Sequence, residues 1–275
     1  MPYQKLDIGG YQFGMDGYFH ANLMRIVNRA IKYKWDALGI FWGKEGTGKS
    51  TNASQSGIVM DNGMTLKTWS WTPDQFEKVI EEAPPESTIV WDEAITGANA
   101  AQWGSAISQS VIRLLTQIRK KRLKIIICFP YLNMLNKYFI SRCLFSVWHY
   151  ARSFSDRGYA RFYNQKETEF AYGLIKEKYR LRPFEGIKMA NYSFSFRYGK
   201  TLCVPEEEYE YLKDEGRKAA ANEGDDIWKN HAINMVRYIR ENAKNKHIST
   251  VSEMAKAIGV SDAYLYKIAK GELTT

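Results

Sequence analysis

Residues 37–50, ALGIFWGKEGTGKS, decide the fold. The first part, 37–42, is an unbroken apolar run that ends at a glycine, which is typical of a buried strand. The second part matches the pattern GxxxxGK[ST] of a phosphate-binding loop, and residues from Ser50 onward are expected to form a helix. Glycines let backbone N–H groups surround phosphates, and a helix N-terminus favours negative charge. We therefore expect a nucleotide, ATP, to bind at Gly43, Lys44, Glu45, Gly46, Thr47, Gly48, Lys49, Ser50 and Thr51.

Two residues of this loop have distinct expected roles. Lys49 reaches the β and γ phosphates, and Ser50 ligates Mg²⁺.

An acidic pair follows a second apolar run, in residues 88–93, TIVWDE. A hydrolytic site of this kind needs a carboxylate near magnesium and a group that positions the attacking water. Asp92 is expected to hold Mg²⁺ through water, and Glu93 to act as the base. This pair favours hydrolysis over simple nucleotide sensing.

Apolar patterns along the chain alternate between strands and helices. Helices are expected at 23–33, from Thr72 to Pro84, and at 102–121, and strands at 37–42, 64–71, 87–91 and 124–129. This order predicts an α/β fold, a mostly parallel sheet flanked by helices with ligands at the carboxyl ends of the strands. Residues 144–152 and 158–163 alternate in polarity and predict an antiparallel extension.

The length of 275 residues allows one large domain and a small one. We assign 1–204 to the ATPase domain, 205–226 to a charged linker helix and 227–275 to a small all-α domain.

Residues 250–273, TVSEMAKAIGVSDAYLYKIAKGEL, resemble a helix-turn-helix. Gly259 fits the turn, and Ser261 fits the cap of the second helix. The candidate DNA contacts on that helix are Tyr264, Tyr266, Lys267 and Lys270. A small helical domain that binds protein is the alternative.

Charge is distributed unevenly along the chain. Residues 111–200 carry 19 Lys and Arg against 5 Asp and Glu, within a net charge of +9. This excess predicts a polyanionic partner, DNA. Arginines and aromatics interleave in 151–200, which suits either stacking on bases or cross-strand packing.

Composition excludes several classes of protein. The three cysteines form no CxxC pair and the four histidines complete no zinc spacing, so neither disulfides nor a structural metal are expected. Apolar runs such as 125–129 are too short to span a bilayer, so we expect a cytoplasmic location and no membrane partner.

The order of phosphate-binding loop, acidic strand, long helix, basic cluster and strand over residues 36–150 resembles the additional-strand (ASCE) P-loop ATPases, especially the FtsK/HerA type. This resemblance implies a homo-oligomeric ring, usually a hexamer, that pumps DNA in chromosome segregation, conjugation or viral packaging. It implies a partner such as a capsid, replisome or mobile-element protein. Arg119 and Arg122 match the place of an arginine that acts on the neighbouring subunit's nucleotide, although a solvated helix end would look the same.

One departure from that pattern concerns the end of the last strand. This type usually has a glutamine there, but the chain reads CFPYLN over 128–133. Asn133 is expected to substitute as the polar sensor, and together with Arg142 it also resembles the sensor and arginine finger of AAA+ ATPases. The alternating strands after 144 favour the FtsK/HerA type.

These features predict an ATP-driven DNA translocase or a packaging or mobilisation motor. The alternatives are an AAA+ helicase loader or replication initiator, and a DNA-binding regulator switched by nucleotide.

Overall fold

The computed structural model describes residues 2–94, 114, 118–153, 155–180 and 182–219. The chain divides into two units, Met1–Arg217 and Lys218–Thr275. The predicted helix-turn-helix, with Tyr264, Tyr266, Lys267 and Lys270, lies outside the described residues, as does most of the helix expected at 102–121. Within the part of the chain that is described, no helix is both long and apolar enough to cross a bilayer.

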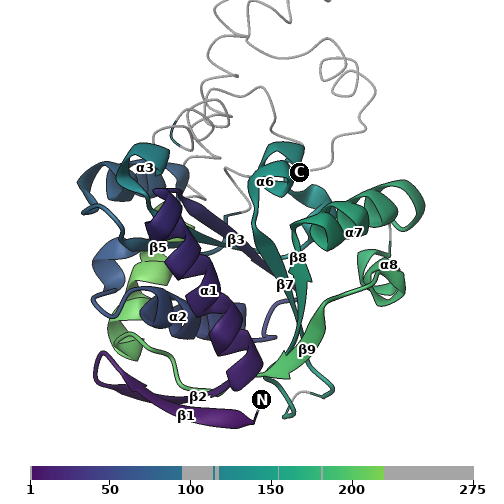
Figure 1. The fold of residues 1–275 in the computed structure, drawn as a ribbon, viewed down its shortest axis with the longest axis horizontal. Helices are drawn as coiled ribbons and strands as arrows, with labels where there is room; N and C mark the ends of the chain where they lie inside the picture. The colour runs from purple at the N-terminus through teal and green to yellow at the C-terminus, as the bar shows by residue number, and fades with distance from the viewer. Residues whose placement is uncertain (1, 95–113, 115–117, 154, 181, 220–275) are drawn as a thin grey trace, which may run out of the picture. The chain divides into compact units, whose positions relative to one another are not determined.

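A seven-stranded sheet in the order β4-β5-β6-β3-β7-β8-β9 forms the centre of the first unit (Figure 1). Its strands are β4 (Trp69–Ser70), β5 (Thr88–Trp91), β6 (Lys124–Phe129), β3 (Ala37–Trp42), β7 (Phe145–Tyr150), β8 (Tyr159–Asn164) and β9 (Phe194–Arg197). The pairs from β4 to β7 are parallel, whereas β7, β8 and β9 pair antiparallel. The predicted α/β fold with an antiparallel extension is confirmed.

β6 lies between β3, which leads into the phosphate-binding loop, and β5, which ends before the acidic pair. Trp42 on β3 pairs with Phe129, and Trp91 on β5 pairs with Ile127. Because the three strands are parallel and nearly in register, the residues that follow them emerge at one edge of the sheet.

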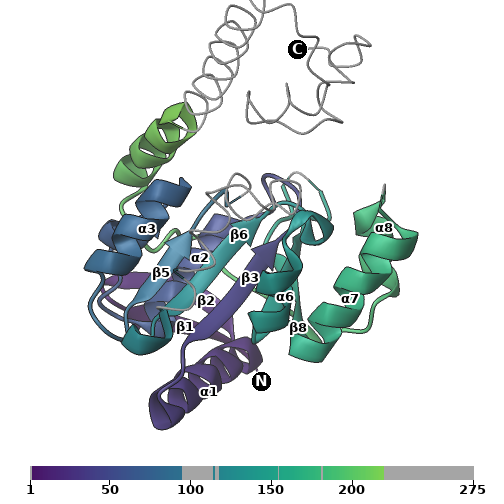
Figure 2. The same ribbon diagram turned by 90° about the horizontal axis from the view of Figure 1, so that it is seen from above.

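Helices cover both faces of the sheet (Figures 1 and 2). One core contains Leu38, Ile40 and Trp42 of β3, and the other contains Phe41, because successive strand side chains point to opposite faces. The helices over the first core are α3 (Pro73–Glu82), α6 (Lys137–Arg142), α7 (Gln165–Lys178) and α8 (Pro183–Met189), and those over the second are α1 (Gly17–Tyr33) and α2 (Lys49–Met60). All six residues of β3 and of β6 are buried, as the apolar runs predicted.

Local sequence signals account for some boundaries. α3 begins at Pro73 after Thr72, whose hydroxyl accepts a hydrogen bond from Gln75 N in a capping box. The strand predicted at 64–71 is wrong except for β4, because Leu66–Thr68 form a 3₁₀ turn capped by the side chain of Thr65.

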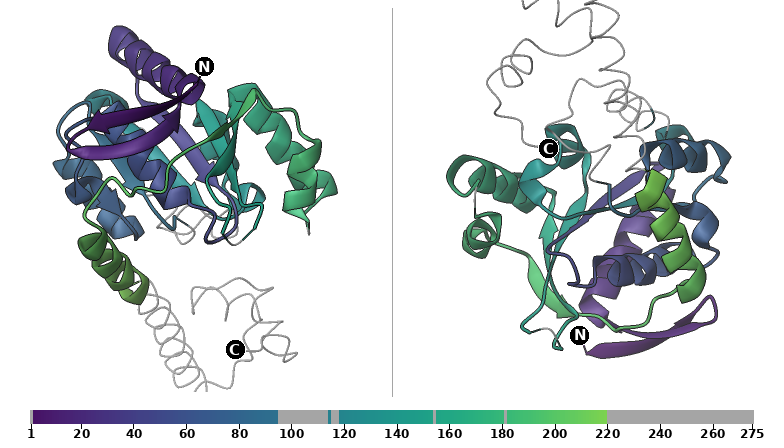
Figure 3. Two further views of the ribbon diagram at one scale, coloured as in Figure 1. Left: turned by 90° about the horizontal axis from the view of Figure 1, so that it is seen from below. Right: turned by 180° about the vertical axis from the view of Figure 1, so that it is seen from behind.

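An N-terminal hairpin was not predicted. β1 (Tyr3–Ile8) and β2 (Tyr11–Asp16) form a separate two-stranded sheet. Met15 of β2 bridges Tyr198, and Gly199 N donates to Gly14 O, so the chain leaving β9 passes beside the hairpin (Figure 3). Residues 206–219 then form a helix.

The packing between β3 and β7 makes a prediction about Gly39. A Cβ there would lie 2.5 Å from the ring of Phe145. We expect Gly39→Ala to lower the free energy of unfolding in urea by about 1–3 kcal/mol, since an added methyl overfills the core. Gly173→Ala in α7 is the control, because its Cβ meets nothing within 4 Å and should raise that free energy by about 0.5–1 kcal/mol. Equal effects of the two substitutions would contradict the packing described.

Candidate nucleotide-binding site

The phosphate-binding loop joins the end of β3 to the start of α2. Gly43, Gly46 and Gly48 have φ values of 144°, 71° and 93°, which L side chains rarely adopt. A Cβ on Gly43 would also collide with the carbonyl oxygen of His149. Lys49 Nζ donates to the carbonyl oxygens of Gly43 (2.8 Å) and Lys44 (3.0 Å), so its ammonium lies inside the loop.

Buried polar groups next to this loop connect it to the neighbouring elements. His149 on β7 places Nε2 2.9 Å from Nδ2 of Asn52, the fourth residue of α2. Its Nδ1 lies 3.4 Å from the carbonyl oxygen of Trp42. Burial, and then the charge of Lys49, lower the pKa of His149 to about 3, so the ring is neutral. The loop is thus tied to two strands and a helix.

The acidic pair lies directly beside the loop. Ser50 Oγ donates to Asp92 Oδ2 over 2.9 Å, and Asp92 is 1% exposed. The hydroxyl and the carboxylate are oxygen ligands of the kind that Mg²⁺ prefers, so both residues fit a magnesium ion shared with phosphate. Glu93, the next residue, has a left-handed φ of 54°, and its N–H donates to Asp92 Oδ1.

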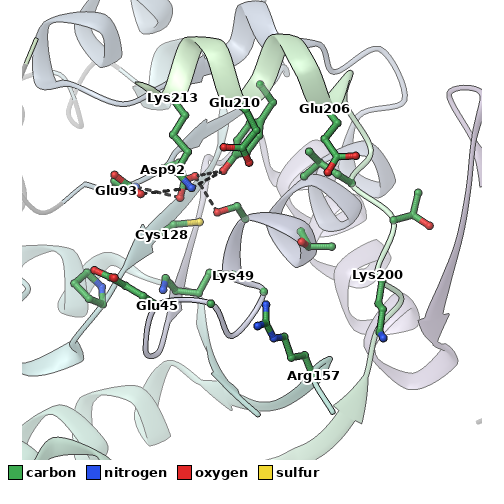
Figure 4. A pocket seen from close by; sticks show the side chains of 18 of the residues that line it. Glu45, Lys49, Asp92, Glu93, Cys128, Arg157, Lys200, Glu206, Glu210 and Lys213 are labelled. Atoms are coloured by element: carbon green, nitrogen blue, oxygen red, sulfur yellow. Dashed lines mark hydrogen bonds and ion pairs between the residues drawn. The ribbon is translucent and has the colours of Figure 1, made fainter. Parts of the chain in front are cut away.

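The helix at 206–219 lines this site with five side chains, Glu206, Tyr209, Glu210, Lys213 and Arg217. Figure 4 labels Glu206, Glu210 and Lys213. Three of the five contact the acidic pair. Tyr209 OH donates to Asp92 Oδ2 over 2.7 Å, and Lys213 Nζ donates to Tyr209 OH. Arg217 donates from two nitrogens to Glu93, over 2.9 Å to Oε2 and 2.6 Å to Oε1. Lys213 Nζ lies 3.5 Å from the same Oε1. Both oxygens of Glu93 are therefore engaged by cations.

Opposing effects set the charge state of Glu93. Burial by itself would raise the pKa of this carboxyl, but the hydrogen bond from Arg217 and the charge of Lys213 outweigh it and lower the pKa. Glu93 is consequently an anion, the form that a general base requires.

The phosphate-binding loop, the acidic pair and this helix enclose a cavity of about 780 Å³. Arg157 and Lys200 approach from the side opposite Lys213 (Figure 4). Gln55 Nε2 on α2 donates to the carbonyl oxygens of Gly199 and Thr201 and fixes the segment that carries Lys200. A cavity of this size with a few convergent polar groups is typical of a small-molecule site.

The structure brings Lys49, Ser50, Asp92 and Glu93 together at this cavity. Asn133 does not line it, because its Nδ2 faces the carbonyl oxygen of Arg180 at 3.4 Å. Buried Cys128 lies near Asp92 instead, and burial raises the pKa of its thiol.

The three predicted arginines lie away from this cavity. Arg119 and Arg122 precede β6, and so lie near the sheet edge opposite the phosphate-binding loop. Arg122 pairs with Glu86, and Arg142 pairs with Asp36. Contact between any of them and a nucleotide would require a second subunit, so a role in trans stays a prediction.

Sequence reasoning missed Tyr209, Lys213 and Arg217, which it placed in a linker. Their spacing of four residues puts them on one helix face, and that is the signal that could have found them. Since they pack on the acidic pair, the first unit extends through Arg217 and not only to residue 204.

A phosphate-binding loop between a central strand and a helix, with a paired serine and aspartate, defines a P-loop nucleoside triphosphatase fold. No protein-family model and no curated protein matches this chain. Among solved structures it is similar to the N-terminal domain of zonular occludens toxin from Neisseria meningitidis (16% identity, 47% of this chain and 84% of that chain, TM-score 0.36). It is also similar to the genome packaging NTPase B204 from Sulfolobus turreted icosahedral virus 2 in complex with ATP-gammaS, with 9% identity over 61% of this chain and 98% of that chain and a TM-score of 0.36. A third similar structure is the FIGL-1 AAA domain, with 13% identity over 98% of this chain and 91% of that chain and a TM-score of 0.37.

Burial of neutral His149 should make the stability of the folded protein depend on pH in the acid range. Its pKa is about 3 in the folded protein against 6.5 in the unfolded chain, so the unfolded chain binds the extra proton between these values and stability falls as the pH falls. Between pH 6 and pH 4 we expect the free energy of unfolding to fall by about 1.4 kcal/mol per pH unit more in the wild type than in His149→Gln. Urea unfolding at each pH measures this, and identical slopes would show that His149 is not buried neutral.

Proposed function

We propose that this protein hydrolyses ATP with magnesium and uses the energy to move DNA, acting as a cytoplasmic homo-oligomeric ring. The observation that carries the hydrolytic part is the placement of Ser50, Asp92 and Glu93 beside Lys49. The excess of basic residues in 111–200 supports a nucleic-acid partner. Residues 227–275 would then find the substrate or a partner such as a capsid, replisome or mobile-element protein.

Each residue of the site has a defined task in this proposal. Loop N–H groups and Lys49 bind the phosphates, and Ser50 and Asp92 hold the metal ion, which supplies charge neutralisation when bound. Glu93 accepts a proton from the attacking water. Before that step Glu93 must be released from Arg217, because both of its oxygens are engaged.

The first test is ATP hydrolysis by the purified chain with and without duplex and single-stranded DNA. We expect DNA to raise turnover, Lys49→Ala to abolish phosphate binding, and Glu93→Gln to lower turnover by about 10²- to 10⁴-fold while ATP still binds. Glu177→Gln on α7 is a charge-matched control for Glu93→Gln and should leave turnover unchanged.

The same measurement separates the alternatives. Slow turnover that DNA leaves unchanged would favour a helicase loader or replication initiator over a motor. Sequence-specific DNA binding with negligible hydrolysis would favour a nucleotide-switched regulator. Full activity in Glu93→Gln would contradict the role of Glu93 as base.

The proposed release of Glu93 from Arg217 can be tested separately, by its effect on turnover. Arg217 is 55% exposed on its side chain, and exposed ion pairs contribute at most about 1 kcal/mol. If this pair must break before catalysis, Arg217→Ala should raise basal turnover by up to about fivefold, as measured at saturating ATP. Arg217→Lys serves as a control that keeps the charge. A fall in turnover in Arg217→Ala would instead mean that Arg217 assists the reaction directly.

A further inference from the structure

The outer face of α1 is strongly basic. Arg25, Arg29 and Lys32 are exposed and follow one another at intervals of four and three residues, which places them along one side of the helix. Residues 17–35 contain no Asp or Glu. Among the salt bridges of the described residues, none involves these three cations or exposed Lys34. Lys32 Nζ lies over the ring of Tyr33, 5.3 Å from its centroid. Since no salt bridge of the described residues neutralises these cations, their charge remains for a ligand or for solvent.

Exposed aromatic rings adjoin these cations. Of the ten large hydrophobic side chains exposed among the described residues, three, Ile31, Tyr33 and Trp35, lie within five positions of one another. Tyr33 is 56% and Trp35 54% exposed, and their ring centroids are 6.3 Å apart. Burying large rings is normally favourable, so two neighbouring rings left in water at the end of a basic helix indicate a binding surface.

Two shallow hollows adjoin α1, one along the helix and one beyond its end. The first, of about 520 Å³, is lined by both arginines, Lys32 and Tyr33. The second, of about 410 Å³, is lined by Trp35, Arg119 and Arg142, together with Asp36, which pairs with Arg142. Tyr33 thus borders the first hollow and Trp35 the second, and guanidinium groups line both.

Several of the described arginines and aromatics of 151–200 pack against one another or in the core. The guanidinium of Arg161 lies over the rings of Trp148 and Tyr192, 5.2 and 4.3 Å from their centroids. Phe162 and Phe196 are buried in the core. These side chains serve packing, one of the two roles expected for that segment.

We propose that the α1 basic face, formed by Arg25, Arg29, Lys32, Tyr33 and Trp35, binds single-stranded nucleic acid. The cations, one helical turn apart, pair with successive phosphates, and the two rings stack on unpaired bases. Duplex DNA would leave the rings without bases to stack on. The inference deepens the proposed function and rests on it for the identity of the polyanion.

The test measures the affinity of the full chain, without nucleotide, for a fluorescent oligo-dT strand by anisotropy at several salt concentrations. Arg25→Ala/Arg29→Ala should reduce the slope of log K against log salt by about 1.4, since each phosphate contact contributes about 0.7. Tyr33→Ala/Trp35→Ala should weaken oligo-dT binding by about tenfold or more and leave duplex binding unchanged. Lys166→Ala/Lys178→Ala on α7 removes the same charge from exposed positions elsewhere. This control should change neither the salt slope nor the affinity for oligo-dT.

Other outcomes overturn the inference. It fails if the α1 variants bind oligo-dT as the wild type does, if the aromatic variant loses duplex binding equally, or if the wild type prefers vesicles of anionic phospholipid to oligo-dT. Should these failures occur while DNA still stimulates ATP hydrolysis, only the location of the surface is wrong. A wild type that binds neither form of DNA and is not stimulated by it would remove the nucleic-acid part of the proposed function as well.

Discussion

The hydrogen bond from Ser50 to Asp92 joins residues 42 positions apart, and it depends on the register of three strands. β6 pairs with β3 on one side and with β5 on the other, so the ends of β3 and β5 reach the same edge of the sheet. A shift of one residue in either pairing would turn Trp42 or Trp91 from one core to the other. The two buried cores therefore fix the site, because they allow only one register.

A second constraint is the negative charge gathered at this edge. Asp92 is almost fully buried and Glu93 follows it in a left-handed backbone conformation. Two adjacent carboxylates repel each other unless cations or hydrogen-bond donors compensate them. Ser50 and Tyr209 donate to Asp92, while Arg217 and Lys213 pair with Glu93. The helix at 206–219 thus compensates the negative charge of the acidic pair.

Features encoded in contiguous residues were predictable. β3 and β6 were found with their observed limits because apolar runs bounded by charged residues and glycine or proline leave little choice. The start of α3 was found because Thr72-Pro73 is a strong helix-start signal. The contribution of Tyr209 could not be predicted from the sequence, since a charged helix that packs on a site has the same composition as one that connects two units. The orientation of the Asn133 side chain could not be predicted either, because its amide donates to the carbonyl oxygen of Arg180, which is distant in sequence.

The distribution of charge along the sequence also fails to predict where uncompensated charge lies in the fold. Counting along the sequence assigns the positive excess to 111–200 and leaves the N-terminal part slightly acidic. In the fold, however, the acids nearest to α1 in sequence make other contacts: Asp16 accepts hydrogen bonds from Tyr18 N and Phe19 N, and Asp36 pairs with Arg142. The arginines of α1 are therefore not neutralised by the acids near them in sequence, whereas Arg161 is covered by aromatic rings. A polyanion responds to the charge that remains uncompensated within about a Debye length, roughly 8–10 Å, so spatial neighbours decide where it binds and sequence neighbours do not.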